Sequence, residues 1–555
     1  MIGIIAHEGD KEIVAEFFEL FKTPWEFFDH NKYYDILITT NDNLPTDQAR
    51  LIIQFSASAS PSNEIQHIEV TPMESGNFLQ FDNELLPIYG KLAQIRGDGQ
   101  EFLQVKNKAA SAGMKTTGKN KLIIRIGYEL FNEVKYLLTF GQPPENALIP
   151  ALDLHISLLR TLISDAGIPF IEIPPVPAGY NFIVCLTHDI DFIRISDHKF
   201  DHTMFGFIYR ATIMTLIDVI RKRRDLRDLY QNWKAVLKLP FVYLGLAQDF
   251  WFKFDRYMEL ESKVNAKSTF FMIPFKNKAG RKVADKRYKR RAAKYDVTDI
   301  PATVKKLVTN GHEAGLHGLD AWHDIEDAVA EKSRIESVSG TADIGIRMHW
   351  LCFDRNSYSI LDEAGFSYDS TFGYNNAVGF RSGTAQAFKP PGVNNLYELP
   401  LHIQDTALFN PKHMALSKNI AWNLCEDLMG KTVKNGGILT ILWHDRSLSP
   451  ERLYEDFYTK LLGELESHNV WFATATNARN WFQFRRSIKF KKVTKNGNKF
   501  TIELENKENI LKPPSRVRLY HPQTRDASFA APQQRRYPPY VDVVWKGESN
   551  ISFDL

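Results

Sequence analysis

The strongest constraint on the fold is a series of eight short apolar runs between residues 181 and 477, each of which ends on polar residues. The runs are FIVCLTHDID, STFFMIP, HEAGLHG, IGIRMHW, YDSTFGY, LYELPLHIQD, GGILTILWHD and NVWFATATN. Stretches with helical patterns separate them. Such runs are typical of strands that are buried on both faces, and strands that alternate with helices form parallel sheets. We therefore predict an α/β protein with a distorted parallel (β/α) barrel over residues 176–487.

The regions on either side of the predicted barrel have other patterns. Residues 1–175 open with IGIIAH, DKEIVAEFFELFK and YDILITT, which predict a strand, an amphipathic helix and a second strand of an N-terminal α/β domain. The proline-rich stretch Ile171–Asn181 marks the end of that domain. Residues 488–555 contain Asn496-Gly497 between two alternating runs, a hairpin pattern, so we predict a small C-terminal β-rich module.

A long insert at about residues 193–266 interrupts the predicted barrel. It contains MFGFIYRATIMTLIDVIRKRR, which is apolar and then basic. We expect a helical subdomain that packs over the barrel, and a membrane-surface helix is the alternative. The basic runs Arg221–Lys234 and Lys276–Lys294 are expected to be solvated faces, or else an electropositive rim for anionic substrates.

Composition limits the class and location of the protein. The net charge of +3 argues against a nucleic-acid-binding protein, which would carry a strong basic excess. Three scattered cysteines, Cys185, Cys352 and Cys425, form no disulfide framework and fit a reducing compartment. The N-terminus lacks the features of a signal peptide, and no uninterrupted apolar stretch reaches the ~18 residues of a spanning helix. We expect a cytoplasmic protein, with membrane association as an alternative.

Polar side chains that are suited to catalysis follow most of the barrel runs. They are Asp189, Asp191, His317, Asp320, His323, Arg347, His349, Asp369, Asp405, His444 and Asp445. The carboxyl ends of parallel strands meet at one edge, where α/β enzymes hold their active sites. One carboxylate and two imidazoles are a usual ligand set for a catalytic divalent metal. A second carboxylate as base and a further histidine as acid complete the equipment for metal-assisted hydrolysis of an amide or ester.

At these residues the sequence resembles the polysaccharide deacetylases (carbohydrate esterase family four, the NodB-homology fold), over about residues 181–482. LTHDID is similar to the family's first motif, which implies that Asp189 is the base and Asp191 a metal ligand. KSTFFMIP and GHEAGLHG are similar to the next two strands of the family, and the second implies His317 as a ligand.

Two later motifs extend the resemblance. IGIRMHW stands where the family has its arginine motif, which implies that Arg347 orients the catalytic aspartate. ILTILWHD resembles the last motif and implies His444 as the acid, with Asp405 in LHIQDTAL as the carboxylate that tunes it.

The sequence departs from the family at the second metal histidine, whose position is occupied by Ala321. We take His323 as the substitute, because WHDIEDA resembles the family's helix start after that histidine. His349 is the alternative, since it ends a neighbouring strand. His312, at the beginning of its strand, is expected to be structural, and Asp320 is a candidate to hold an imidazole by a hydrogen bond.

The segment Tyr368–Gly392 is rich in glycine, aromatic and hydroxyl residues. Long segments of this kind are often functional, so we predict that it lines a sugar-binding cleft, with a plain surface loop as the alternative. We assign substrate binding to Tyr374, Arg381 and Trp443. The planar guanidinium of Arg381 suits an anionic substituent or a phosphate.

The resemblance implies a metal-dependent hydrolase that removes an N-acyl group, by default acetyl, from a sugar. Zn²⁺ is the expected metal, with Co²⁺ or Ni²⁺ as alternatives. The expected substrate is a cell-surface glycan or its lipid- or nucleotide-linked precursor. HGLDAW also resembles a deformylase branch of the family, so a deformylase or another amidohydrolase stays open, as does a non-catalytic glycan-binding protein.

Overall fold

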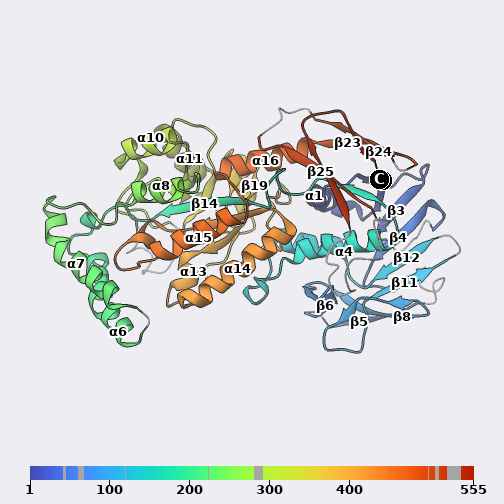
Figure 1. The fold of residues 1–555 in the computed structure, drawn as a ribbon, viewed down its shortest axis with the longest axis horizontal. Coiled ribbons are helices and arrows are strands. Elements are labelled where there is room, and N and C mark those ends of the chain that lie inside the picture. Colours follow the sequence, from blue (N-terminus) through green and yellow to red (C-terminus); the bar gives the residue numbers. More distant parts are fainter. Residues whose placement is uncertain are drawn as a thin grey trace. The chain divides into compact units, whose positions relative to one another are not determined.

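The computed structural model describes residues 1–41, 46–59, 68–74, 76–118, 121–222, 224–280, 292–497, 499–506, 512–521 and 539–554. The chain forms two compact units, each of which is described by itself (Figure 1). The first unit consists of residues 1–179, 380–391 and 481–555, and the second of residues 180–379 and 392–480. Most of the basic run Lys276–Lys294 lies outside the described residues.

The first unit is built on a seven-stranded sheet with the order β2-β1-β3-β4-β12-β11-β9. Its elements up to residue 172 are β1 (Ile2–Ile5), α1 (Lys11–Phe21), β2 (Trp25–Phe27), β3 (Tyr34–Thr39), β4 (Ala49–Phe55), β5 (Ile68–Met73), β6 (Phe78–Phe81), β7 (Glu84–Pro87), β8 (Leu92–Gly97), β9 (Gln100–Glu101), β10 (Gln104–Val105), β11 (Gly113–Thr117), β12 (Leu122–Ile126), α3 (Leu130–Thr139), α4 (Ala151–Asp165) and β13 (Phe170–Glu172). The pairs from β2 to β12 along this order are parallel. The α/β character predicted for this region is therefore confirmed.

The C-terminal region joins the first unit instead of forming a module of its own. It contains β23 (Lys489–Asn496), β24 (Lys499–Glu505), β25 (Ser515–Tyr520), β26 (Tyr540–Trp545) and β27 (Asn550–Asp554). The predicted hairpin is present, since β23 and β24 pair around Asn496 and Lys499. However, β25 pairs with β13, and the rings of Phe170 and Tyr520 stack with their centroids 4.5 Å apart. The N- and C-terminal regions therefore share a sheet, where the sequence pattern predicts two separate domains.

The second unit holds the predicted parallel sheet. Its strands are β14 (Ile183–Ile190), β15 (Thr269–Met272), β16 (Glu313–Gly318), β17 (Ile346–Met348), β18 (Tyr368–Asp369), β19 (Tyr397–Glu398), β20 (Leu401–Gln404), β21 (Ile438–Leu442) and β22 (Trp471–Phe472). The order is β19-β18-β17-β16-β15-β14-β21-β20, with β22 beside β14, and every pair is parallel. The eight runs thus give nine strands, because LYELPLHIQD contains both β19 and β20.

Helices lie between most of these strands along the chain, and α16 follows the last strand. They are α8 (Phe254–Ser262), α10 (Pro301–Thr309), α11 (Ile325–Ser339), α12 (Ser357–Glu363), α13 (Asp405–Phe409), α14 (Lys418–Asn435), α15 (Glu455–Ser467) and α16 (Ala475–Ser487). The Asp324 side chain caps α11 at its start, and Gly340, at φ +75°, ends it. These connections cover a sheet whose strands are almost wholly buried, as apolar runs of this kind require.

The insert after β14 is helical, as predicted. It contains α5 (His202–Tyr209), a turn of π-helix at Arg210–Met214, α6 (Thr215–Ile220) and α7 (Leu226–Tyr243). Buried side chains that include Phe207, Ala211, Leu239 and Val242 form a separate small core between them. We call the segment from Phe200 to Leu246 the helical hairpin.

Candidate metal centre

The strand order brings the predicted site residues to one edge of the sheet in the second unit. Asp189 lies in β14 and Asp191 just after it, while His317 and Arg347 are direct partners in β16 and β17. On the other side of β14, Trp443 follows β21 and its amide donates to the Thr187 carbonyl at 2.9 Å. His444 comes next in the chain, so residues far apart in the sequence meet at the carboxyl ends of neighbouring strands.

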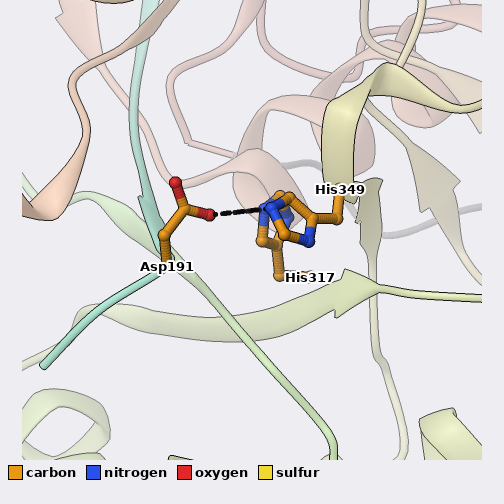
Figure 2. Close-up of side chains that lie close together, drawn as sticks. All are labelled: Asp191, His317 and His349. Atoms are coloured by element: carbon orange, nitrogen blue, oxygen red, sulfur yellow. Dashed lines mark ion pairs between the residues drawn. The ribbon is translucent and has the colours of Figure 1, made fainter. Parts of the chain in front are cut away.

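Asp191, His317 and His349 form a compact cluster (Figure 2). Asp191 Oδ1 lies 3.3 Å from His317 Nε2 and 3.4 Å from His349 Nε2. One ligand atom from each residue lies within 4.8 Å of the other two. Among the described residues, no donor makes a well-formed hydrogen bond to the buried Asp191 Oδ1, although the ring nitrogens of His317 and His349 face it.

The electrostatics of the cluster favour a bound cation. Burial alone would raise the pKa of Asp191, but the neighbouring His317, His349 and His444 hold it well below its usual range. Burial lowers the pKa of His349 to about 4, against the opposing charge of Asp191. Burial also lowers the pKa of His317, but Asp189 and Asp191 outweigh it and raise that pKa. The cluster thus holds an ionised carboxylate and the neutral imidazole of His349 at pH 7, and a bound metal would require the neutral form of His317 as well.

The orientation of both imidazoles is set by their surroundings. His317 Nδ1 lies 3.0 Å from the Arg347 carbonyl and donates to it, so Nε2 carries the free lone pair toward Asp191. The His349 ring stacks on Trp350, with the ring centroids 4.7 Å apart. Trp350 and Leu351 both have positive φ, 63° and 51°, a strained conformation for bulky residues that is typical of functional sites.

These residues fit a divalent metal by their chemistry. A carboxylate and two imidazoles are the donor set of many catalytic zinc sites, and the group leaves coordination positions for water and substrate. The hydrogen bond from His317 Nδ1 to a carbonyl is the usual outer support of a metal-binding histidine. Asp191, His317 and His349 would therefore hold the metal.

His323, the third ligand favoured by the sequence, is not in this cluster. Its Nε2 lies 3.2 Å from Asp320 Oδ1. The loop that carries it is anchored by Glu331 of α11, which accepts hydrogen bonds from the Leu319 and Asp320 amides, both at 2.8 Å. The structure thus places the alternative, His349, at the third position. Asp320 does hold an imidazole, but this imidazole belongs to His323 and not to a residue of the cluster.

Asp189, the predicted base, is buried beside the cluster. Its Oδ2 lies 3.9 Å from His317 Nε2, and its Oδ1 accepts a hydrogen bond from Arg347 Nη1 at 3.2 Å. Arg347 is fully buried and is itself fixed by hydrogen bonds to the Thr187 hydroxyl and to the carbonyl and hydroxyl of Ser370. Arg347 therefore holds Asp189 in one orientation, in agreement with the prediction from the arginine motif.

His444, the predicted acid, pairs with the predicted tuning carboxylate. His444 Nδ1 lies 2.5 Å from Asp405 Oδ1, and its amide donates to Oδ2 at 3.1 Å. Burial lowers the pKa of His444, but the charge and hydrogen bond of Asp405 outweigh it and raise the pKa to about 9. Asp189 and Asp191 contribute in the same direction, since both lie near enough to act on His444. At pH 7 the imidazole is therefore protonated and can donate.

The remaining predicted residues lie outside this group. Trp443 is fully buried and stacks on Phe457 and Tyr458, so the structure places it in the core. Tyr374 is buried too, and its carbonyl accepts from Gln404. Arg381 falls in the first unit, so its contact with a substrate stays a prediction.

Three further polar residues named from the sequence have structural surroundings. His312 Nδ1 accepts a hydrogen bond from the Ser268 amide at 3.1 Å, a structural contact as expected. Asp369 accepts from the Thr371 amide. Asp445 accepts from the Phe192 amide at 2.9 Å and so closes the start of the insert onto the loop after β21.

No family model and no curated protein matches the chain. Solved structures do match part of the chain. One is a Mycobacterium smegmatis protein described as a polysaccharide deacetylase, with 17% identity over 56% of this chain and 95% of that chain, at a TM-score of 0.35. Another is described as a polysaccharide deacetylase of Pseudomonas aeruginosa PAO1, with 15% identity over 58% and 97% and a TM-score of 0.36.

Polysaccharide deacetylases are thus among the solved structures that this chain resembles. PuuE allantoinase is another, with 14% identity over 56% of this chain and 92% of that chain, at a TM-score of 0.35. At these scores the similarity assigns no residue of the present chain to a function.

Proposed function

We propose that this protein is a metal-dependent hydrolase that removes an N-acyl group, by default acetyl, from a sugar. One observation carries the proposal: the Asp191, His317 and His349 cluster lies beside a fixed carboxylate, Asp189, and near a protonated imidazole, His444. The motifs LTHDID, GHEAGLHG and ILTILWHD, which resemble those of the polysaccharide deacetylases, supply these same groups.

Each of these residues has its own role in the proposed reaction. A divalent metal held by the cluster would polarise the amide carbonyl and make water a better nucleophile, and Zn²⁺ is the default. Asp189 takes the proton of the attacking water, with Arg347 keeping its carboxylate in position. His444 gives its proton to the departing amine, and Asp405 keeps His444 protonated until then.

The substrate that we propose is a carrier-linked glycan precursor in the cytoplasm. All three cysteines are free, as in proteins of a reducing compartment. A lipid- or nucleotide-linked N-acetylhexosamine is therefore a better first substrate than an assembled polymer. A deformylase would use the same residues, so the released acid, acetate or formate, decides between the two.

The test is acid release by the zinc- or cobalt-loaded protein from N-acetylated and N-formylated sugars on lipid and nucleotide carriers. Asp189→Asn should lower turnover by about 10²–10⁴-fold, because asparagine still accepts from Arg347 but takes no proton. Asp343→Asn, at an exposed carboxylate that pairs with Arg479, should leave it unchanged. Full turnover in Asp189→Asn would rule out the base, and no release from any carrier would favour a non-catalytic glycan-binding protein.

A further inference from the structure

The helical hairpin, residues 200–246, carries an unusual concentration of exposed apolar side chains. Among the described residues, thirteen of the 24 exposed large apolar side chains belong to it. The most exposed are Phe200 at 82%, Leu237 at 75%, and Leu226 and Leu246 at 73% each. Soluble monomers rarely expose apolar residues so densely, and such patches mark interaction surfaces.

Each helix of the hairpin has two apolar stripes. In α7 the buried stripe includes Ala235, Leu239 and Val242, and faces the hairpin core. The exposed side chains of α7 and its end also follow three- and four-residue steps: Leu226, Tyr230, Trp233, Leu237, Phe241 and Leu244. At 100° per residue this second stripe lies on the side of α7 away from the core.

The first half of the hairpin, from α5 through the π-helical turn to α6, has the same two stripes. Its exposed apolar residues are Phe205, Tyr209, Ile213, Leu216 and Ile220, again at steps of three and four. Its buried face carries Met204, Phe207 and Ala211. A buried hydrogen bond of 2.8 Å from Asn232 to the Thr215 hydroxyl joins the two helices across the hairpin core. The exposed stripes are therefore additional to the apolar contacts that the hairpin needs to fold.

The net charge of the hairpin indicates what kind of surface covers the exposed apolar stripes. The helical hairpin, residues 200–246, contains eight lysines and arginines against four aspartates, a net charge of +4, whereas the rest of the chain is net −1. On α7, Arg227, Lys234 and Lys238 are exposed and follow one flank between the two stripes. A second copy of the hairpin would bring like charges together, so the charge disfavours self-association and favours an anionic surface.

We infer that the helical hairpin docks on the surface of a lipid bilayer that contains anionic headgroups. Exposed leucine and phenylalanine side chains would enter the acyl boundary, tyrosine and tryptophan suit the interface, and the basic flank would pair with headgroups. Among the described residues, one helix, His202–Ile220, is long and apolar enough by length and composition alone to cross a membrane, which by itself is weak evidence. Because this helix pairs with α7, we favour a hairpin that lies on the membrane surface over a helix that crosses the membrane.

The experiment is flotation of the full chain with vesicles of phosphatidylcholine alone and of phosphatidylcholine with phosphatidylglycerol in equal parts. We expect binding to the mixed vesicles. Leu237→Ser with Leu244→Ser should weaken it about tenfold or more, because two leucine side chains lose their apolar contact. Lys234→Gln with Lys238→Gln should weaken it about tenfold or more on the mixed vesicles only.

Matched controls use exposed apolar residues outside the hairpin. Tyr33→Ser and Ile420→Ser, at sites 67% and 57% exposed, should bind vesicles as the wild type does. His317→Ala should also bind, since docking does not require the metal, and this separates the inference from the proposed function. Absence of vesicle binding would overturn the inference, as would equal loss in the control variants. A dimer that Leu237→Ser with Leu244→Ser dissociates, without vesicle binding, would assign the stripes to a second copy instead.

Discussion

At the residue scale, the site depends on how neighbouring groups fix each ionisable side chain. His317 is oriented by the Arg347 carbonyl, Asp189 by the Arg347 guanidinium, and His444 by Asp405. Arg347 thus positions both a residue of the candidate metal centre, His317, and the proposed base, Asp189, through different atoms. Since it is fully buried, any replacement would leave several acceptors without a donor.

The pairing of His444 with Asp405 gives a prediction on pH. The proposed mechanism needs the acid form of His444, so activity should fall as pH rises through its pKa of about 9. In Asp405→Asn the charge that raises this pKa most is lost, and burial lowers the pKa while Asp189 and Asp191 still raise it, so the pKa should fall toward its usual value of about 6.5. The alkaline limb of kcat/KM should therefore move down by about one to two pH units.

The control for this shift is Asp456→Asn, at an exposed carboxylate at the start of α15. It should leave the pH profile of kcat/KM as in the wild type. An alkaline limb that stays in place in Asp405→Asn would show that Asp405 does not set the protonation of His444.

The sequence predicts most of these residues, because each follows an apolar run that is typical of a buried strand. His323 is preferred over His349 as third ligand from the resemblance of WHDIEDA to the family's helix start, and the structure differs for a physical reason. The path of the loop after β16 is set by Glu331, eleven residues or more along the chain, whose carboxylate binds the Leu319 and Asp320 amides. No local pattern reveals such a contact. The polar ending of IGIRMHW was the available signal for His349.

At the element scale, β17 couples packing to the site, since it carries Arg347 and leads into His349. The residue before it, Gly345, faces the ring of Tyr368, where a Cβ would lie 1.9 Å from Cζ. The ring cannot easily move, because the Tyr368 hydroxyl donates to Glu313 at 2.6 Å. Glycine at this position is what allows β17 and β18 to pack.

Gly345→Ala should therefore lower the free energy of unfolding by about 1–3 kcal/mol and weaken metal binding too, because Arg347 and His349 follow directly. Denaturant unfolding and metal titration measure the two effects. Gly463→Ala is the matched control, since Gly463 is exposed on α15 with no atom within 4 Å of the added Cβ. It should raise stability by up to about 1 kcal/mol. Equal effects of the two substitutions would contradict this account of β17.

At the scale of the whole molecule, the chain leaves and re-enters its first unit twice. Residues 380–391 belong to the first unit, although the sequence places them inside the barrel region. The sheet of β13, β25 and β26 likewise joins residues about 350 positions apart. Strand pairs between residues so far apart cannot be predicted from local composition. The sequence therefore predicts the elements of the N- and C-terminal regions but not that these regions share a sheet.

All residues of the proposed centre lie in the second unit: Asp189, Asp191, His317, Arg347, His349, Asp405 and His444. The helical hairpin belongs to the same unit but contributes none of these residues. This division predicts that substitutions in the hairpin change vesicle binding without changing metal content.

The most direct measurement is the metal content of the purified protein after incubation with Zn²⁺, compared with His317→Ala, His349→Ala and His323→Ala. The cluster geometry predicts about one equivalent in the wild type and in His323→Ala, and loss of the metal in His317→Ala and His349→Ala. Metal that is lost in His323→Ala but retained in His349→Ala, or absent from the wild type, would contradict the centre described above.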